Sequence, residues 1–102
     1  NEMDTEAIYK ALASPIRRQI LQCLKEPDRY ISSEECGNDF SRGVCAGQME
    51  KIADISQSTM SNHLSVLQQA GLIHVTKYGQ WSYFSRNEAL IEEFLQHLQH
   101  AL

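Results

Sequence analysis

Apolar residues recur every three to four positions in two stretches at the start of the chain. Ile8 and Leu12 share one side of the first stretch, and a second apolar stripe runs over residues 16–24. This spacing is typical of amphipathic helices that bury one side. Ser14 can cap the second helix, and Pro27 ends it. The pattern therefore predicts two short helices that meet near Ser14.

Residues 28–43 interrupt the helical pattern. The segment is polar and acidic, and glycines punctuate it where an apolar stripe would be needed. We predict an irregular loop, whose length is unusual in a compact domain and typical of functional loops. Helical spacing returns over residues 45–53, where Met49 and Ile52 form the apolar side.

The next helical stretch combines an apolar stripe with an opposite side that carries no charge. Met60, Leu64 and Leu67 lie at i, i+4 and i+7, so they share the buried side of a helix. Ser56 can cap its start, and Gly71 can end it. The pattern predicts a fourth helix close behind the third.

Two β-rich runs and a last helix complete the chain. Residues 72–78 and 81–85 are rich in β-branched and aromatic side chains, and Gly79-Gln80 between them is typical of a hairpin turn. Asn87 can cap a final helix with a broad apolar side. The members of that side are Leu90, Ile91, Phe94, Leu95, Leu98 and Leu102.

These elements predict a mainly α fold with a small β-hairpin (α+β), in the order α-α-α-α-β-β-α. A single domain over residues 1–102 accommodates them. The order is that of a winged helix-turn-helix, in which the third and fourth helices form the two-helix unit and the hairpin is the wing.

The uncharged side of the fourth helix is the first candidate for chemistry. A solvated helix face usually carries Glu and Lys, whereas Gln and Asn can read adenine, and Ser and Thr can bond base edges or phosphate. At the hairpin, Trp81 either joins such contacts or packs on the fourth helix as a core aromatic. The predicted DNA contacts are Gln57, Ser58, Thr59, Ser61, Asn62, Ser65, Lys77 and Gln80.

The net charge of −4 at first argues against binding to nucleic acid, because the chain has nine Lys and Arg but 13 Asp and Glu. The acids, however, are concentrated in residues 26–50 and 87–102. Residues 51–86 carry three basic residues and one acid. Residues 51–86, which include the predicted DNA contacts, are thus mildly basic, and we expect a shallow dependence of DNA affinity on salt.

Composition indicates which broad class of protein the chain belongs to. At 42% hydrophobic and 22% charged residues, the chain is typical of a globular protein. No apolar stretch is long enough for a membrane span, and three cysteines do not make a disulfide scaffold, so we expect a cytoplasmic protein without membrane contact. His63, His74 and the scattered acids form no nucleophile–base pattern, which predicts that the protein is not an enzyme.

Two stretches resemble the ArsR/SmtB family of bacterial transcriptional repressors. They are residues 11–21, Ala-Leu-Ala-Ser-Pro-Ile-Arg-Arg-Gln-Ile-Leu, and residues 55–67, Ile-Ser-Gln-Ser-Thr-Met-Ser-Asn-His-Leu-Ser-Val-Leu. Ala70-Gly71-Leu72 and the hairpin residues 79–81 fit as well, so the resemblance covers nearly the whole chain outside residues 28–43.

The resemblance implies a homodimer that binds a palindromic operator in double-stranded DNA, blocks transcription and is released by an inducer. It places Gln57, Ser58, Ser61 and His63 against the DNA, and the first and last helices in the dimer interface. The alternative, from another class, is a winged-helix module that binds proteins without reading DNA.

The inducer stays open between a thiol switch and a metal or metalloid ion. Family members often carry a cysteine pair on the third helix. Here Cys45 matches the first position, but Gly47 occupies the second. Cys36 could join Cys45 in a disulfide or a metal site, and Cys23 on an apolar stripe is a core residue. No cofactor is certain.

A second candidate metal site involves His97 and His100. Their i, i+3 spacing puts both imidazoles on one side of the last helix, as in the late ligand pair of zinc-binding family members. The early pair is missing, and Arg86 stands in the matching region, so Glu88 or Glu93 would have to substitute. The alternative is two surface histidines near a helix C-terminus.

Overall fold

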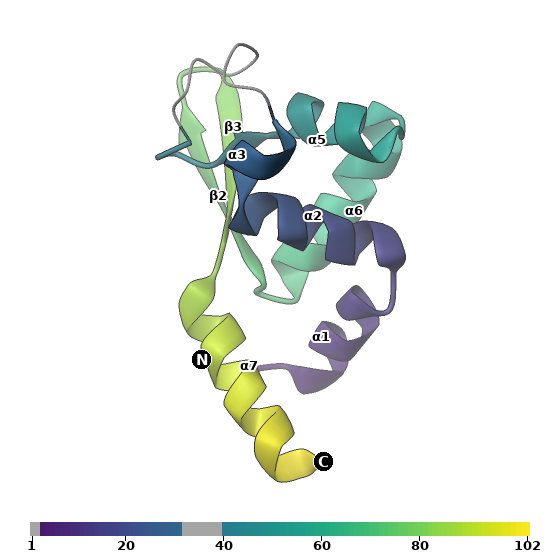
Figure 1. Cartoon of the computed structure of the whole chain (residues 1–102), viewed down its shortest axis with the longest axis vertical. Helices are drawn as coiled ribbons and strands as arrows, with labels where there is room; N and C mark the ends of the chain where they lie inside the picture. The colour runs from purple at the N-terminus through teal and green to yellow at the C-terminus, as the bar shows by residue number, and fades with distance from the viewer. Residues whose placement is uncertain (1–2, 32–39) are drawn as a thin grey trace.

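The computed structural model describes residues 3–31 and 40–102, and their arrangement is shown in Figure 1. The elements are α1 (Thr5–Leu12), α2 (Pro15–Lys25), α3 (Pro27–Tyr30), β1 (Val44–Cys45), α5 (Ala46–Ala53), α6 (Gln57–Gln69), β2 (Ile73–Tyr78), β3 (Trp81–Arg86) and α7 (Glu88–Ala101). This mainly helical order with a β-hairpin confirms the predicted winged helix-turn-helix.

Helix starts follow the predicted caps. The side-chain oxygens of Ser14, Ser56 and Asn87 accept hydrogen bonds from backbone amides of the first turns of α2, α6 and α7. Asp4 does the same for α1 through the Ala7 amide, at 3.1 Å. Each cap satisfies an amide that has no partner within its helix, so these boundaries are locally encoded.

Two elements were not predicted. Pro27–Tyr30 form the short helix α3, so the predicted loop begins with helical residues, and residues 32–39 of that loop lie outside the described part. Val44 and Cys45 form β1, which adds a third strand to the hairpin in the order β1-β3-β2. Cys45 therefore pairs with Tyr83 and caps α5, and its placement as the first residue of the third helix was wrong.

The apolar stripes meet in one core. Met60, Leu64 and Leu67 of α6 are buried against α1, α2 and the sheet, as their spacing predicted. Cys23 of α2 is also buried, and burial raises the pKa of its thiol, as expected for a small core residue. The core orients α6 with its uncharged side outward.

Gly43 is the point at which the chain must approach β3 closely. Its φ of +112° suits glycine, and a Cβ there would collide with the carbonyl oxygen of Phe84. We expect Gly43→Ala to cost at least about 2 kcal/mol of unfolding free energy and roughly 8 °C in Tm. The matched control is Gly47→Ala in α5, whose added Cβ would meet nothing within 4 Å. Calorimetry showing equal Tm values for the two variants would contradict this prediction.

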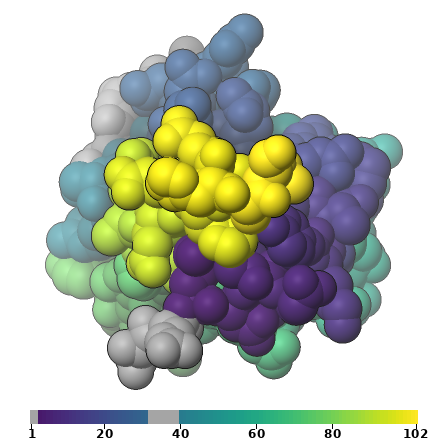
Figure 2. Space-filling view, turned by 90° about the horizontal axis from the view of Figure 1, so that it is seen from below, coloured from purple at the N-terminus to yellow at the C-terminus, as the bar shows by residue number. Residues whose placement is uncertain are grey.

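The last helix stands apart from the body. In Figure 1, α7 extends away from the sheet toward the end of the molecule where α1 lies, and the principal extents are 43 × 25 × 25 Å. Figure 2 shows α7 and α1 side by side on this end. The contact includes the rings of Tyr9 and Phe94, which meet edge to face with centroids 5.6 Å apart.

Candidate nucleic-acid interface

The predicted reading side of α6 is exposed. Six of the seven predicted contact residues of α6 are open to solvent: Gln57, Ser58, Thr59, Ser61, Asn62 and Ser65. At the start of the helix, the Ser56 hydroxyl lies 2.9 Å from that of Thr59 and 3.3 Å from that of Ser58. The side chains further along are open for contacts with a ligand.

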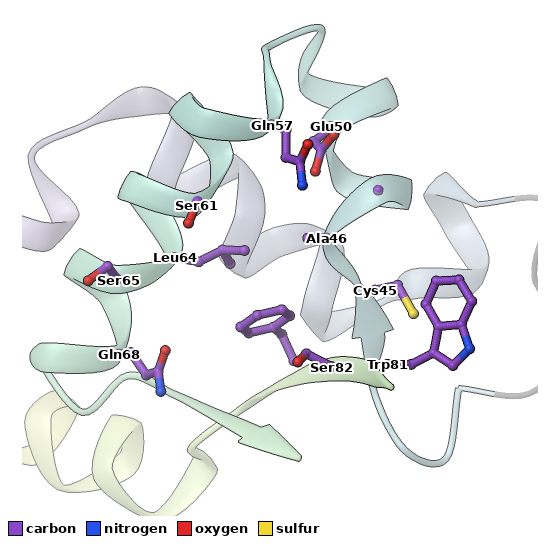
Figure 3. A pocket seen from close by; sticks show the side chains of 12 residues that line it. Cys45, Ala46, Glu50, Gln57, Ser61, Leu64, Ser65, Gln68, Trp81 and Ser82 are labelled. Carbon is purple, nitrogen blue, oxygen red and sulfur yellow. The ribbon is translucent and has the colours of Figure 1, made fainter. Parts of the chain in front are cut away.

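A cleft of about 510 Å³ runs between this side of α6 and the wing (Figure 3). Gln57, Ser61, Ser65 and Gln68 line it from α6, and residues of α5 and β3 form the other wall. Glu50 of α5 is its one acidic lining residue among those described. The cleft thus presents hydroxyls and amides over an apolar floor, with little charge of either sign.

Trp81 lies at the wing end of this cleft. Its side chain is 60% exposed, so the interpretation of Trp81 as a core aromatic was wrong. It pairs in register with Tyr78 of β2, which is 56% exposed. Two large, rigid aromatic side chains are therefore exposed at the hairpin, where Lys77 and Gln80 are also exposed.

Arg42 adds a cation to the wing that sequence reasoning missed. Its guanidinium carbon lies 3.7 Å from the centre of the Tyr78 ring, a cation–π contact. Arg42 precedes β1 by two residues, and only the pairing of β1 with β3 brings it to the hairpin. No local pattern in the segment around Arg42 signals this position.

His63 is not placed like the other predicted contacts of α6. It is partly buried, and its Nδ1 lies 3.1 Å from Nη1 of Arg17 in α2. Burial, and then the positive charge of Arg17, hold the pKa of His63 below its ordinary value. The lowered pKa favours the neutral form of the ring.

The candidate sensing residues are dispersed. Cys45 is partly buried, and burial raises the pKa of its thiol although a hydrogen bond with Tyr83 opposes the rise. A raised pKa leaves less of the reactive thiolate at neutral pH. Cys36 lies outside the described residues, so its distance from Cys45 is open.

At α7, His97 stacks on Phe94 with ring centroids 6.4 Å apart, and His100 is exposed. Glu88 is held by Arg86 through contacts of 2.8 and 3.2 Å, and this hydrogen bonding lowers the pKa of Glu88. Residues 3–31 and 40–102 contain no cluster of three or more His, Cys, Asp or Glu side chains placed to hold a metal ion. Glu88 is thus committed to Arg86, and the histidine pair has no third ligand among these residues.

Similarity to known proteins identifies the family of this chain. A family model described as a helix-turn-helix domain matches residues 41–76. An uncharacterized HTH-type transcriptional regulator of Bacillus subtilis, YbzH, is 37% identical over 97 residues, which span 95% of this chain and 97% of the relative. ArsR2 of Halobacterium salinarum, named a putative arsenical resistance operon repressor, is 34% identical over 70 residues, which span 69% of this chain and 58% of the relative. The chain belongs to the ArsR/SmtB family of winged helix-turn-helix regulators.

Two further comparisons agree with a transcriptional regulator of this fold. The transcriptional repressor SdpR of Bacillus subtilis is 31% identical over 86 residues, covering 84% of this chain and 79% of the relative. The crystal structure of NolR from Sinorhizobium fredii shares the fold, with a TM-score of 0.64, 23% identity, and coverage of 95% of this chain and 82% of that one. The family and the fold predicted from the sequence are confirmed.

As an ArsR/SmtB protein, the chain is a DNA-binding transcriptional regulator and not an enzyme. The alternative of a protein-binding module without DNA readout is not favoured. Within the described ranges, no helix combines the length and apolar character that crossing a bilayer requires.

Proposed function

We propose that the protein is a homodimeric repressor that binds a palindromic operator in the cytoplasm, with residues 1–102 acting as one winged-helix unit per subunit. The observation that carries the proposal is the uncharged, exposed side of α6 facing the wing across a common cleft. SdpR is named a transcriptional repressor, and an archaeal relative, 34% identical over 70 residues, is named a putative arsenical resistance operon repressor.

In this proposal α6 enters the major groove. Gln57, Ser61, Asn62 and Ser65 bond base edges or phosphates, and Ser58 and Thr59, whose hydroxyls lie beside that of the capping Ser56, contact the DNA backbone. The wing reaches the neighbouring backbone with Lys77 and Gln80. Two-fold symmetry places the two α6 helices about one helical turn apart on the operator.

The dimer would form through α1 and α7. Leu95 is 51% exposed and Leu102 is 97% exposed, and with half-buried Leu98 they lie at i, i+3 and i+7 on one side of α7. Tyr9 of α1, 38% exposed, lies beside this side through its contact with Phe94. An apolar stripe of this kind on a protruding helix suits a symmetric interface between two copies.

Selection of bound duplexes from a random library tests the operator proposal. We expect enrichment of an inverted repeat whose half-sites are centred about 10 base pairs apart. Enrichment of a single half-site, with a monomer in sedimentation velocity, would contradict the dimeric part of the proposal. Failure to enrich any sequence would contradict the assignment of α6 as a sequence reader.

The wing should contribute phosphate contacts through Lys77 and Arg42. We expect Lys77→Gln and Arg42→Gln each to reduce the slope of log operator affinity against log salt concentration by about one per subunit. Each variant removes one cation that would otherwise contact a DNA phosphate. Lys25→Gln on α2, which neutralises a cation outside α6 and the wing, is the control. An unchanged salt slope for Arg42→Gln would place its guanidinium away from the DNA.

The inducer is tested by operator affinity in the reduced protein, with and without peroxide and then with Zn(II) or As(III). A peroxide response that is lost in Cys36→Ser and Cys45→Ser supports a thiol switch. A Zn(II) response that is lost in His97→Gln and His100→Gln supports a metal site on α7. A response identical to wild type in these variants contradicts the corresponding hypothesis.

A further inference from the structure

We propose that Arg17 is a positioning residue that links α1, at the proposed dimer interface, to α6 through His63. The guanidinium of Arg17 donates to three groups at once: Nε to the Ala11 carbonyl at 2.7 Å, Nη2 to the Lys10 carbonyl at 3.0 Å, and Nη1 to His63 Nδ1 at 3.1 Å. The inference rests on the proposed operator-binding dimer.

On the α1 side, Arg17 occupies the C-terminal end of the helix. Lys10 and Ala11 belong to the last turn of α1, where carbonyl groups lack the usual i+4 amide partner; the Lys10 carbonyl also accepts from the Ala13 amide at 3.2 Å. A cation at this end also complements the helix dipole. One planar guanidinium satisfies both carbonyls in a fixed geometry, which the single ammonium of lysine does not reproduce.

On the α6 side, the hydrogen bond from Arg17 fixes the tautomer of the His63 ring. Arginine only donates, so Nδ1 must accept and the ring proton lies on Nε2. The imidazole is therefore a neutral acceptor pointing at α2, and it is not free to face a base edge through Nδ1. His63 lies midway along α6, next to the exposed Asn62, so holding its ring limits rotation of the reading side.

The linkage continues to α7. Tyr9 of α1 packs against Phe94 of α7, and Lys10 and Ala11 follow directly in α1. A change in the packing of α1 and α7 between two copies would thus move the carbonyls that hold Arg17, and with them His63. The arrangement supplies a short physical path from the proposed dimer interface to the reading helix.

Arg18 provides a matched control. Its Nη1 donates to the Leu12 carbonyl at 2.6 Å, so it also binds the end of α1, but within residues 3–31 and 40–102 it makes no hydrogen bond to α6. Both arginines lie on α2, carry the same charge and bond α1. Arg17 differs from Arg18 in its bond to His63, in a second bond to α1 and in being partly buried.

The test measures operator affinity by fluorescence anisotropy over a range of salt concentrations, with sedimentation velocity on each variant. We expect Arg17→Lys and His63→Leu each to weaken binding about tenfold at unchanged salt slope, a size typical of coupling between sites. Their double variant should be no weaker than either single variant. His63→Asn, whose Oδ1 can accept from Arg17, should recover most of the affinity lost in His63→Leu, and Arg18→Lys should bind within about twofold of wild type.

A lower salt slope in Arg17→Lys would show that Arg17 contacts phosphate directly, and additive effects in the double variant would show that the two residues act separately. Either result overturns the linkage. So does failure of His63→Asn to recover affinity, because His63 would then act on the DNA itself. Absence of operator binding by the wild-type protein would instead contradict the proposed function, so the two failures are distinguishable.

Discussion

Replacing Ser61 by glutamate should abolish operator binding while leaving the dimer intact. Ser61 is exposed on the second turn of α6 and lines the cleft between α6 and the wing, so the new carboxylate would face phosphates and base-edge acceptors. Like charges across an interface cost several kcal/mol, and we expect a loss of at least about 100-fold in affinity. Anisotropy with the selected operator measures the loss.

The control for this variant is Ala89→Glu on α7. Ala89 is exposed, and an acid in the first turn of a helix is favourable, so the same charge is added outside α6 and the wing without destabilising the fold. We expect Ala89→Glu to bind as wild type does. Wild-type affinity in Ser61→Glu would mean that this side of α6 does not meet DNA.

Replacing Leu95 by glutamate should convert the dimer to folded monomers. Leu95 lies on the apolar stripe of α7, and symmetry would place the new charge in the interface twice. An uncompensated charge in such an interface costs roughly 3–5 kcal/mol, which corresponds to a dimer weakened by more than about 100-fold. Because Leu95 is half exposed in the single chain, we expect circular dichroism to show an intact fold.

Sedimentation velocity at micromolar concentration measures the outcome, with Ala89→Glu again as the control on the same helix. Ala89→Glu should remain dimeric, because position 89 lies on a different side of α7 from Leu95. A dimer that persists in Leu95→Glu would place the interface elsewhere. Monomers in both variants would point to a general effect of charge on α7.

The helices were predictable because their signals are local. The Ser14, Ser56 and Asn87 caps each act on the amide three residues further along, and the stripe of α6 is set by a 3.6-residue period. The hairpin turn at Gly79, where φ is +63°, is equally local. Each of these features depends on neighbours in the chain and needs no tertiary contact.

Apart from the short helix α3, the features that the sequence did not predict depend on distant partners. β1 is two residues long, and only its pairing with β3 makes it a strand. The exposure of Trp81 could not be read from an aromatic in an alternating run, because either face of a strand can be the buried one. The contact between Arg42 and Tyr78 could not be read from the sequence either, because these residues are 36 positions apart and meet only across the sheet.

The sequence by itself determined that the chain forms a winged helix-turn-helix with an uncharged, exposed side on its fourth main helix, and its family resemblance is confirmed. Only the tertiary structure decided what surrounds that helix: the cleft to the wing, Arg42 on Tyr78, and Arg17 between α1 and His63. Helix periods and caps are short-range properties of the chain. The Arg42–Tyr78 and Arg17–His63 contacts join residues 36 and 46 positions apart, so they exist only once the core has brought α2, α6 and the sheet together.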